Sequence, residues 1–231
     1  MNIEQNLDRV IKQATEKIAS VADVLTNDLQ IKNNDVFLVG GFVRDSVLSE
    51  IFNVKNESKD IDIILPIKPD FTNNKNIISQ KQNSLGGIKV KTRNFQEIDI
   101  FQQHVDNPQT IVGGHFDFNC NAIYYSHKQK QIFPSVYFDY FLYNEMLDME
   151  HVIYDGSIKT LYSVPSLVSR ALKFQILFRQ KYGFETRLSN NLLWLIYNMD
   201  KDSERAMQEY TKIKSANLQK QIFQNFQKLR K

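Results

Sequence analysis

Two neighbouring stretches decide the fold: residues 38–45, which read LVGGFVRD, and residues 60–62, which read DID. The apolar run at 36–39 predicts a short buried strand, which a pair of glycines ends. Residues 43–52 then predict a helix, and the apolar run at 61–65 predicts a second strand. The local order is therefore strand, glycine turn, helix and strand.

The two carboxylates of the second strand suggest a metal site. Asp60 and Asp62 are separated by one residue, so their side chains point to the same side of a strand. Adjacent carboxylates repel each other unless a cation lies between them, and carboxylate oxygens suit Mg²⁺. Nucleotidyl transfer uses two such ions, roughly 4 Å apart. A third carboxylate would complete the set, and we predict Asp99 for it, with Glu97 on the same strand face as the alternative.

The glycine turn and the helix after it match what a nucleoside triphosphate requires. Gly40 and Gly41 let the backbone approach phosphates closely, and the first turn of the helix offers free N–H donors. Arg44 adds a fixed positive charge. An isolated Gly-Gly is usually a tight turn, and an isolated Asp-x-Asp is usually solvated surface. Their order along the chain makes the combination specific.

Bulk properties place the chain among ordinary soluble proteins. It has 231 residues, of which 42% are hydrophobic and 24% charged, enough for one core or for a compact domain with a smaller helical appendage. A membrane span is not expected, and the N-terminus lacks the pattern of a secretory or transit peptide. Cys120 is the only cysteine, which excludes an internal disulfide. We expect an intracellular location, in the cytoplasm or an organellar matrix.

The first part of the chain mixes helices and strands. Apolar residues recur every three or four positions over residues 3–29, which predicts an amphipathic helix. Residues 68–82 are polar and poorly periodic, whereas 88–91 and 98–101 predict strands and 121–125 fits either a helix or a strand. Such a mixture predicts an α/β head.

Helices replace this mixture from residue 163 on. Pro165 suits the first turn of a helix, and further helices are predicted at 190–199 and 203–214. An apolar stripe follows the proline, formed by Leu167, Ala171, Phe174 and Phe178. We therefore predict three parts: an N-terminal helix (1–34), a head domain (35–160) and a helical neck (161–231).

The C-terminal segment is basic. Residues 201–231 carry eight Lys or Arg residues against three Asp or Glu, a net charge of +5. Such a charge is typical of a segment that binds the phosphate backbone of a nucleic acid. It is equally typical of the solvated face of a helix rich in Lys and Gln. Both interpretations stay open at this point.

The stretches at 38–45 and 60–62 resemble the bacterial-type poly(A) polymerase and CCA-adding tRNA nucleotidyltransferase family. Further similar motifs follow in the family's order within residues 35–210: SLGGIKV at 84–90, IDI at 98–100, HFDFNCNA at 115–122 and PSLVSRALKF at 165–174. The resemblance implies an α+β nucleotidyltransferase head of the polymerase beta-like type, with a mixed sheet flanked by helices. It also implies an all-helical C-terminal neck after the head.

The resemblance implies site residues and ligands as well. Asp60, Asp62 and Asp99 would bind two Mg²⁺ ions. The nucleotide, ATP or CTP, would contact Gly40, Gly41, Arg44, Asp45, Asp117, Asn121 and Arg170. The acceptor would be an RNA 3′ end, reached through the basic C-terminal segment.

Three departures from the family pattern keep a second hypothesis open. The family has paired arginines just before the position of Asp117, which are here His115 and Phe116, and the first arginine of the later helix is here Leu167. Each change removes a guanidinium that binds phosphate or base in two places. The alternative to an active enzyme is a nucleotidyltransferase-fold module, a structural or RNA-binding subunit that works with a protein partner.

The remaining distinctive residues have simpler interpretations. Cys120 is expected to be a small buried residue rather than a nucleophile. The aromatic run at 133–143 is expected to pack in a core or an interface, more often than to stack on bases. Trp194 is expected to pack in a helical core.

Overall fold

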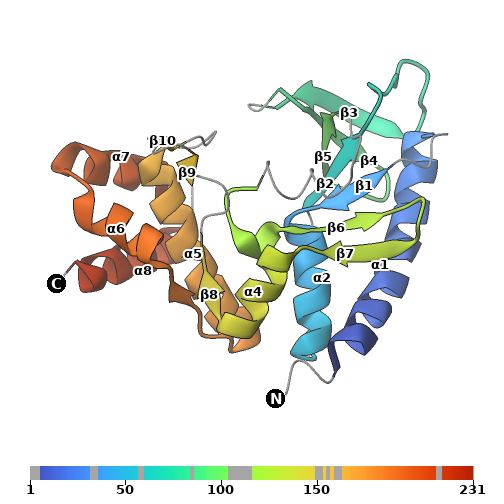
Figure 1. Cartoon of the computed structure of the whole chain (residues 1–231). Helices are drawn as coiled ribbons and strands as arrows, with labels where there is room; N and C mark the ends of the chain where they lie inside the picture. Colours follow the sequence, from blue (N-terminus) through green and yellow to red (C-terminus); the bar gives the residue numbers. More distant parts are fainter. Residues whose placement is uncertain are drawn as a thin grey trace. The chain divides into compact units, whose positions relative to one another are not determined.

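A computed structural model describes residues 6–31, 36–56, 60–83, 86–103, 116–148, 153–154, 157–158, 163–211 and 215–230 (Figure 1). The chain forms two compact units. The first comprises Met1–Gly113 and Asn121–Ser135, and the second comprises Gly114–Cys120 and Val136–Lys231.

The first unit is built on a mixed sheet. In the described residues its seven strands lie in the order β3-β4-β5-β2-β1-β6-β7. The pair β2 and β5 is parallel, and every other neighbouring pair is antiparallel. The strands are β1 (Phe37–Val39), β2 (Asp60–Leu65), β3 (Ile77–Gln82), β4 (Ile88–Thr92), β5 (Glu97–Gln102), β6 (Ile123–Ser126) and β7 (Gln131–Pro134).

Two helices cover one face of this sheet (Figure 1). Helix α2 (Gly41–Ile51) contacts β1, β2 and β6, and helix α1 (Leu7–Leu29) contacts α2 and β7. Alternation along the strands sends large apolar side chains to a buried face, with exposures of 3% or less: Leu38, Ile61, Ile63, Ile98, Ile100 and Tyr125. The polar residues that alternate with these apolar residues on β2 and β5 lie on the opposite face of the sheet.

The second unit is mainly helical. Helix α5 (Val164–Tyr182) contacts α6 (Asn190–Asn198), α7 (Lys201–Thr211) and α8 (Ala216–Leu229). Its predicted apolar stripe is buried, with Leu167 and Ala171 fully enclosed and Phe174 stacked 5.7 Å from Phe178. The remaining elements are the 3-10 turn η2 (Asn119–Asn121), shared with the first unit, α4 (Val136–Asn144), β8 (Met146–Leu147), β9 (Ile153–Tyr154), β10 (Ser157–Ile158) and β11 (Arg187–Leu188).

The division into units differs from the predicted boundary near residue 160. Residues from Val136 on belong to the helical unit. Strand β8 pairs with β11, and Phe141 of α4 lies 5.4 Å from Phe178 of α5, so α4 and β8 share the core of the later helices. A long-range aromatic cluster of this kind leaves no mark on local periodicity.

Six strands of the described residues escaped the sequence analysis (β3, β7, β8, β9, β10 and β11), and one ambiguous segment is now assigned. Strand β3 lies in the polar stretch 68–82, where an edge strand with exposed side chains needs no apolar alternation. Strand β7 overlaps the start of the aromatic run at 133–143, and the ambiguous segment 121–125 lies partly in β6, which runs from Ile123 to Ser126. The other predicted helices and strands are present in the described residues, with ends shifted by a few positions.

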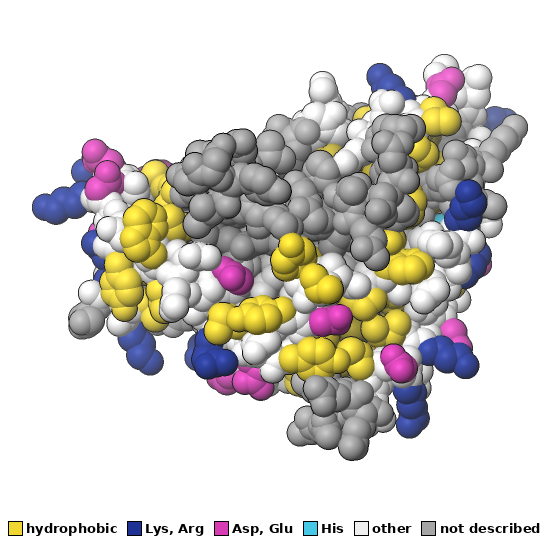
Figure 2. Space-filling view, viewed as in Figure 1, with side chains coloured by type: hydrophobic (Ala, Val, Ile, Leu, Met, Phe, Trp, Pro, Cys, Tyr) yellow, Lys and Arg dark blue, Asp and Glu magenta, His cyan; other side chains and the backbone are white. Residues whose placement is uncertain are grey.

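The predictions for Cys120, the aromatic run and Trp194 had different outcomes. Cys120, Phe138 and Phe141 are fully buried, as expected, whereas Tyr137, Tyr140 and Tyr143 of the aromatic run are 38–45% exposed. The prediction for Trp194 is wrong, because its side chain is 61% exposed. Helix α6 buries Leu192, Leu195 and Ile196 instead, and Trp194 projects from the other side, next to Tyr197. Figure 2 shows hydrophobic side chains, in yellow, over the region of α4 and α6.

None of the helices in the described residues combines the length and the apolar character needed to cross a bilayer.

One buried histidine makes the stability of the first unit depend on pH. His127, in the turn between β6 and β7, is 7% exposed; its Nδ1 lies 3.3 Å from Lys130 Nζ, and its Nε2 lies 3.8 Å from Asp23 Oδ1. Burial lowers the pKa of His127, Lys130 lowers it further, and Asp23 opposes both. The unfolded chain therefore takes up this proton before the folded chain does.

We expect the free energy of unfolding to fall as the pH drops below the ordinary histidine pKa of about 6.5. Replacing His127 with glutamine should flatten this dependence, because the glutamine takes up no proton. Urea denaturation between about pH 5 and pH 8 measures both slopes. An equally steep fall in the His127→Gln variant would show that another group is responsible.

Candidate active site

Four carboxylates gather on the face of the sheet opposite α1 and α2. In the parallel ladder of β2 and β5, Asp60 lies opposite Glu97 and Asp62 lies opposite Asp99. Residues opposite each other in a ladder point to the same face, so all four side chains share it. The structure therefore brings together the predicted pair, the predicted third carboxylate and its alternative.

Asp99 already has protein partners on both of its oxygens. Asn83 Nδ2 donates a hydrogen bond of 2.8 Å to Asp99 Oδ1, and Lys89 Nζ lies 3.3 Å from Asp99 Oδ2. Lys89 also forms an ion pair with Glu97. Neither Asn83 nor Lys89 was expected in the site. Lys89 alternates with buried Val90 on β4, but the register of β4 against β5 cannot be read from the sequence.

The carboxylate face fits a metal ion through β2 rather than through a three-carboxylate cluster. The described residues contain no group of three or more His, Cys, Asp or Glu side chains arranged to hold a metal. Asp60 and Asp62 are two carboxylates one residue apart on the same face of β2. Such a pair is sufficient for Mg²⁺, which commonly takes one or two carboxylates and completes its shell with water and substrate phosphate.

The glycine turn lies at the same edge of the sheet as these aspartates. Val39, the last residue of β1, lies opposite Asp62 in the antiparallel ladder with β2, so the turn that follows comes next to the beginning of β2. Gly40 has φ of 70° and ψ of −140°, a combination that essentially only glycine adopts. Helix α2 begins at Gly41, and its N-cap residue, Gly40, forms no side-chain hydrogen bond to the first N–H groups of the helix.

Arg44 is held firmly beneath this turn. Its side chain is buried; Nε donates a hydrogen bond of 2.7 Å to Asp45 Oδ1, and Nη1 donates one of 2.6 Å to Asn121 Oδ1. A Cβ atom added to Gly41 would lie 3.5 Å from Arg44 Nη2, which places the guanidinium against the glycine turn. Five residues predicted to bind nucleotide thus meet in one place: Gly40, Gly41, Arg44, Asp45 and Asn121.

The other two predicted nucleotide-binding residues pair with each other in the second unit. Arg170 Nε lies 2.6 Å from Asp117 Oδ2, and Arg170 Nη2 donates a hydrogen bond of 3.2 Å to Asp117 Oδ1. Burial raises the pKa of Asp117, and the Arg170 guanidinium opposes this rise. Leu167, where the family motif has an arginine, is fully buried on the same helix. His115 lies outside the described residues.

Comparisons with known proteins agree with this fold. No protein-family model and no curated protein matches the sequence. Solved structures do match. A CCA-adding enzyme with ATP is 15% identical with a TM-score of 0.59, covering 99% of this chain and 55% of that chain. A CCA-adding enzyme with CTP is 16% identical with a TM-score of 0.54, covering 92% of this chain and 49% of that chain.

A third solved structure is the Thermotoga maritima CCA-adding enzyme complexed with tRNA. It is 16% identical with a TM-score of 0.51, covering 83% of this chain and 46% of that chain. This chain spans about half the length of these three structures. At such identities the likeness shows the fold. The predicted fold is confirmed: a mixed sheet flanked by helices and a helical C-terminal region, as in the head and neck of CCA-adding enzymes.

Proposed function

We propose that this protein is a metal-dependent nucleotidyltransferase that moves a nucleoside monophosphate from a nucleoside triphosphate to a hydroxyl group, with an RNA 3′ end as the acceptor. One observation carries the proposal. The Asp60 and Asp62 pair lies at the same sheet edge as the glycine turn and the start of α2. The structures that share this fold hold ATP, CTP or tRNA.

Each group at this edge has a role in the proposed reaction. Asp60 and Asp62 would hold Mg²⁺, which neutralises developing charge on the triphosphate and lowers the pKa of an attacking hydroxyl. Gly40 and Gly41 would let phosphate oxygens approach the backbone closely, and the first N–H groups of α2 would donate to them. Arg44 is fixed by Asp45 and Asn121, so its charge would not need to reorganise during the reaction.

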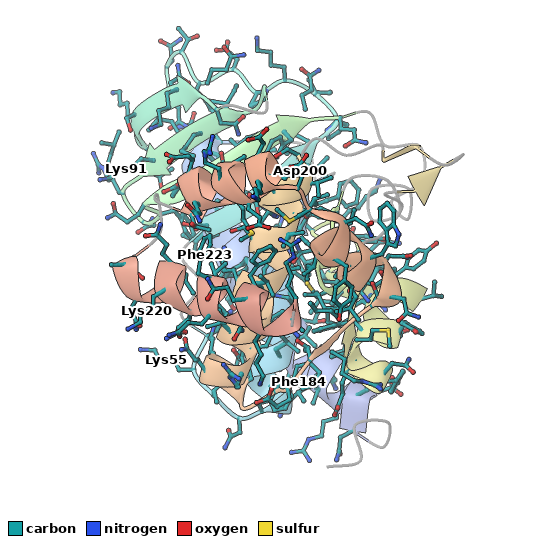
Figure 3. All side chains as sticks on the ribbon, turned by 90° about the vertical axis from the view of Figure 1, so that its left-hand side faces the viewer. Lys55, Lys91, Phe184, Asp200, Lys220 and Phe223 are labelled. Atoms are coloured by element: carbon teal, nitrogen blue, oxygen red, sulfur yellow. The ribbon has the colours of Figure 1, made fainter. Side chains whose placement is uncertain are left out.

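The acceptor side rests on the basic C-terminal segment. In the described residues this segment forms α7 and α8, and Ile222 and Phe226 of α8 face the interior while Lys220 is exposed. Figure 3 labels Lys220 and Phe223 on this helix. An exposed lysine on such a helix is typical of a surface that binds a phosphate backbone, and it is equally typical of a solvated helix surface. Only a test that includes an RNA separates these two interpretations.

The alternative function, a catalytically weakened module, has its own supporting observations. The carboxylate of Asp117 is occupied by Arg170, and Leu167 belongs to the core, so this part of the family pattern serves packing here. Retention of the Asp60 and Asp62 pair argues for catalysis, because two neighbouring carboxylates with no ion between them would destabilise the fold.

Thermal unfolding with and without nucleotide provides a first test. With Mg²⁺ present, ATP or CTP at ten times its dissociation constant is expected to stabilise the protein by about 1.4 kcal/mol, raising the melting temperature. The stabilisation should vanish when EDTA removes the metal. A melting temperature that stays the same at millimolar ATP, CTP, GTP and UTP would favour the module.

Labelled nucleotide and a short RNA then separate binding from catalysis. The enzyme hypothesis predicts extension of the RNA by one or more nucleotides, with product length and base identity revealing the preferred nucleotide. Metal-dependent binding of nucleotide without extension of any RNA would point to a different hydroxyl acceptor or to the module.

A further inference from the structure

A row of lysines continues the carboxylate face toward the edge of the sheet. Lys89 of β4 lies opposite Asp99 of β5 on one side and opposite Lys81 of β3 on the other. Residues opposite each other in a ladder share one face, and Lys91 returns to that face two positions after Lys89. Lys81, Lys89 and Lys91 therefore lie on the same face of the sheet as the carboxylates.

These three lysines line an open hollow in the surface, with a volume of about 210 Å³. The only carboxylate among the described residues of its lining is Glu97, so three lysines and one glutamate give a net charge of +2. The other polar side chains of the lining are neutral, those of Ser79, Gln80 and Gln96, and no described lining residue is aromatic. Such a lining can bind phosphate and ribose oxygens, but it offers no ring on which a base could stack.

The lysines of the hollow have different partners. Lys89 forms ion pairs with Glu97 and, at 3.3 Å, with Asp99, and its charge therefore offsets the carboxylates of β5. Lys81 and Lys91 form no ion pair with any residue that the structure describes, and Lys81 is exposed. Lys81 and Lys91 thus provide the positive charge that an incoming anion would meet.

Lys81 and Lys91 lie diagonally across the ladder of β3 and β4, because Lys91 is opposite Ser79. Diagonal neighbours in an antiparallel ladder are about 7–8 Å apart, within reach of long side chains. Each ammonium is a compact charge on a flexible stem with three N–H donors. Together they can contact one phosphate group or two successive phosphates of one strand.

The position of the hollow relative to the carboxylates follows from the strand order. Neighbouring strands lie about 4.8 Å apart, so β4 is about 10 Å and β3 about 14 Å from β2. A strand of nucleic acid whose end lies at β2 can therefore place phosphates behind that end over β4 and β3. The hollow is open enough for a strand to pass across it.

We propose that this hollow binds the phosphate backbone of the acceptor RNA, with Lys81 and Lys91 contacting phosphate and Lys89 shielding the strand from the carboxylates of β5. This inference rests on the proposed function, because it takes the bound strand to be the acceptor. It adds a phosphate-binding site in the first unit to the basic segment of the second unit. Contacts of this kind position a strand without reading its sequence.

The salt dependence of RNA binding tests the proposal without turnover and without a metal ion. A short single-stranded RNA with a dye at its 5′ end is titrated with the protein in EDTA, between about 50 and 200 mM salt, and fluorescence anisotropy gives the association constant. Each phosphate contact to a single strand contributes about 0.7 to the steepness of log K against log salt. For two contacts, Lys81→Gln with Lys91→Gln is expected to reduce this steepness by about 1.4.

Two further double variants serve as controls. Lys81→Arg with Lys91→Arg keeps both charges and should keep the wild-type steepness. Lys12→Gln with Lys55→Gln removes two charges from exposed positions on α1 and just after α2, and it should also keep the wild-type steepness. Lys55 and Lys91 lie well apart in Figure 3. Thermal unfolding of each variant confirms that it is folded.

Thermal unfolding also distinguishes a strand from a free phosphate ligand. Pyrophosphate is added to the wild type and to the glutamine variant of Lys81 and Lys91. Equal effects on the two melting temperatures are expected, because the hollow binds the backbone of a strand. Stabilisation by pyrophosphate that is lost in this variant, with the salt dependence of RNA binding unchanged, would assign the hollow to a free phosphate ligand and overturn the proposal.

The remaining outcomes separate this inference from the proposed function. Unchanged steepness in the glutamine variant of Lys81 and Lys91, or an equal loss in the variant of Lys12 and Lys55, overturns the phosphate site and leaves the proposed function intact. The lysines of β3 and β4 would then protect an edge strand from pairing with another chain. A wild type that binds no RNA at the lowest salt overturns this inference together with the proposed acceptor. RNA binding that depends on Lys81 and Lys91, in a protein that Mg²⁺ and ATP do not stabilise, supports the phosphate site and counts against nucleotidyl transfer.

Discussion

Replacing Asp60 and Asp62 together with asparagine is expected to reduce nucleotidyl transfer at least about a thousandfold. The metal ion supplies several kcal/mol of transition-state stabilisation, and each loss of about 1.4 kcal/mol costs a factor of ten in rate. Asparagine keeps the size of the side chain and removes the charge that attracts the ion. The measurement is the rate of RNA extension with labelled ATP or CTP in the presence of Mg²⁺.

Asp8 offers a matched control for this change. It lies exposed in the first turn of α1, so Asp8→Asn should leave the rate within about twofold of the wild type, as expected for a surface position. Both variants should melt close to the wild type, which separates a lost reaction from a lost fold. A double variant that still extends RNA at more than a tenth of the wild-type rate would remove Asp60 and Asp62 from the mechanism.

Replacing Arg170 with methionine is expected to lower the free energy of unfolding by about 3–5 kcal/mol, because the change strands the carboxylate of Asp117 in a buried site. Asp117 has a side chain that is 6% exposed, and Arg170 is its ion-pair partner at 2.6 Å. Methionine retains the apolar stem, so the loss reflects the missing charge. Urea denaturation gives the value directly.

The loss should depend on pH in a definite direction. Burial already raises the pKa of Asp117, and Arg170 opposes that rise, so its removal leaves the pKa higher still. The folded variant then holds the proton to a higher pH than the unfolded chain does. Its stability should fall as the pH rises above the ordinary aspartate value of about 3.9, and the defect should be largest near neutrality.

Arg179, on the same helix, serves as the control for this prediction. Its side chain is 51% exposed and lies 3.9 Å from Glu185, which is 73% exposed. An exposed pair of this kind contributes about 1 kcal/mol or less, so Arg179→Met should have a small effect. Equal losses in the two variants would mean that packing of the long side chains, rather than buried charge, determines the stability of α5.

The parts of the fold that were predicted are those with strong local patterns. The glycine turn, the strand with Asp60 and Asp62, and the stripe of Leu167, Ala171, Phe174 and Phe178 each have a period or a turn signal that depends on neighbouring residues. Strand β3 and the exposed Trp194 were missed. An edge strand needs no apolar side chains, and the orientation of a short helix is set by partners distant in sequence.

The site residues also divide into those that a local sequence pattern predicts and those that depend on contacts distant in sequence. Asp60 and Asp62 could be placed on one face from their spacing alone. The contacts of Asp99 with Asn83 and Lys89 depend on the order and register of β4, β5 and β2, which the sequence leaves open. The pairing of Asp117 with Arg170 spans 53 positions along the chain, and no local pattern announces it.

The outward position of the single tryptophan has a consequence for spectroscopy. The indole of Trp194 is 61% exposed in the folded protein, so it already meets the solvent that it would meet in the unfolded chain. Its emission should lie at the long-wavelength end of the tryptophan range and should change little on unfolding. The same fluorescence should respond strongly to any molecule that binds over α6. It will therefore be a poor probe of folding and a sensitive probe of ligands on that helix.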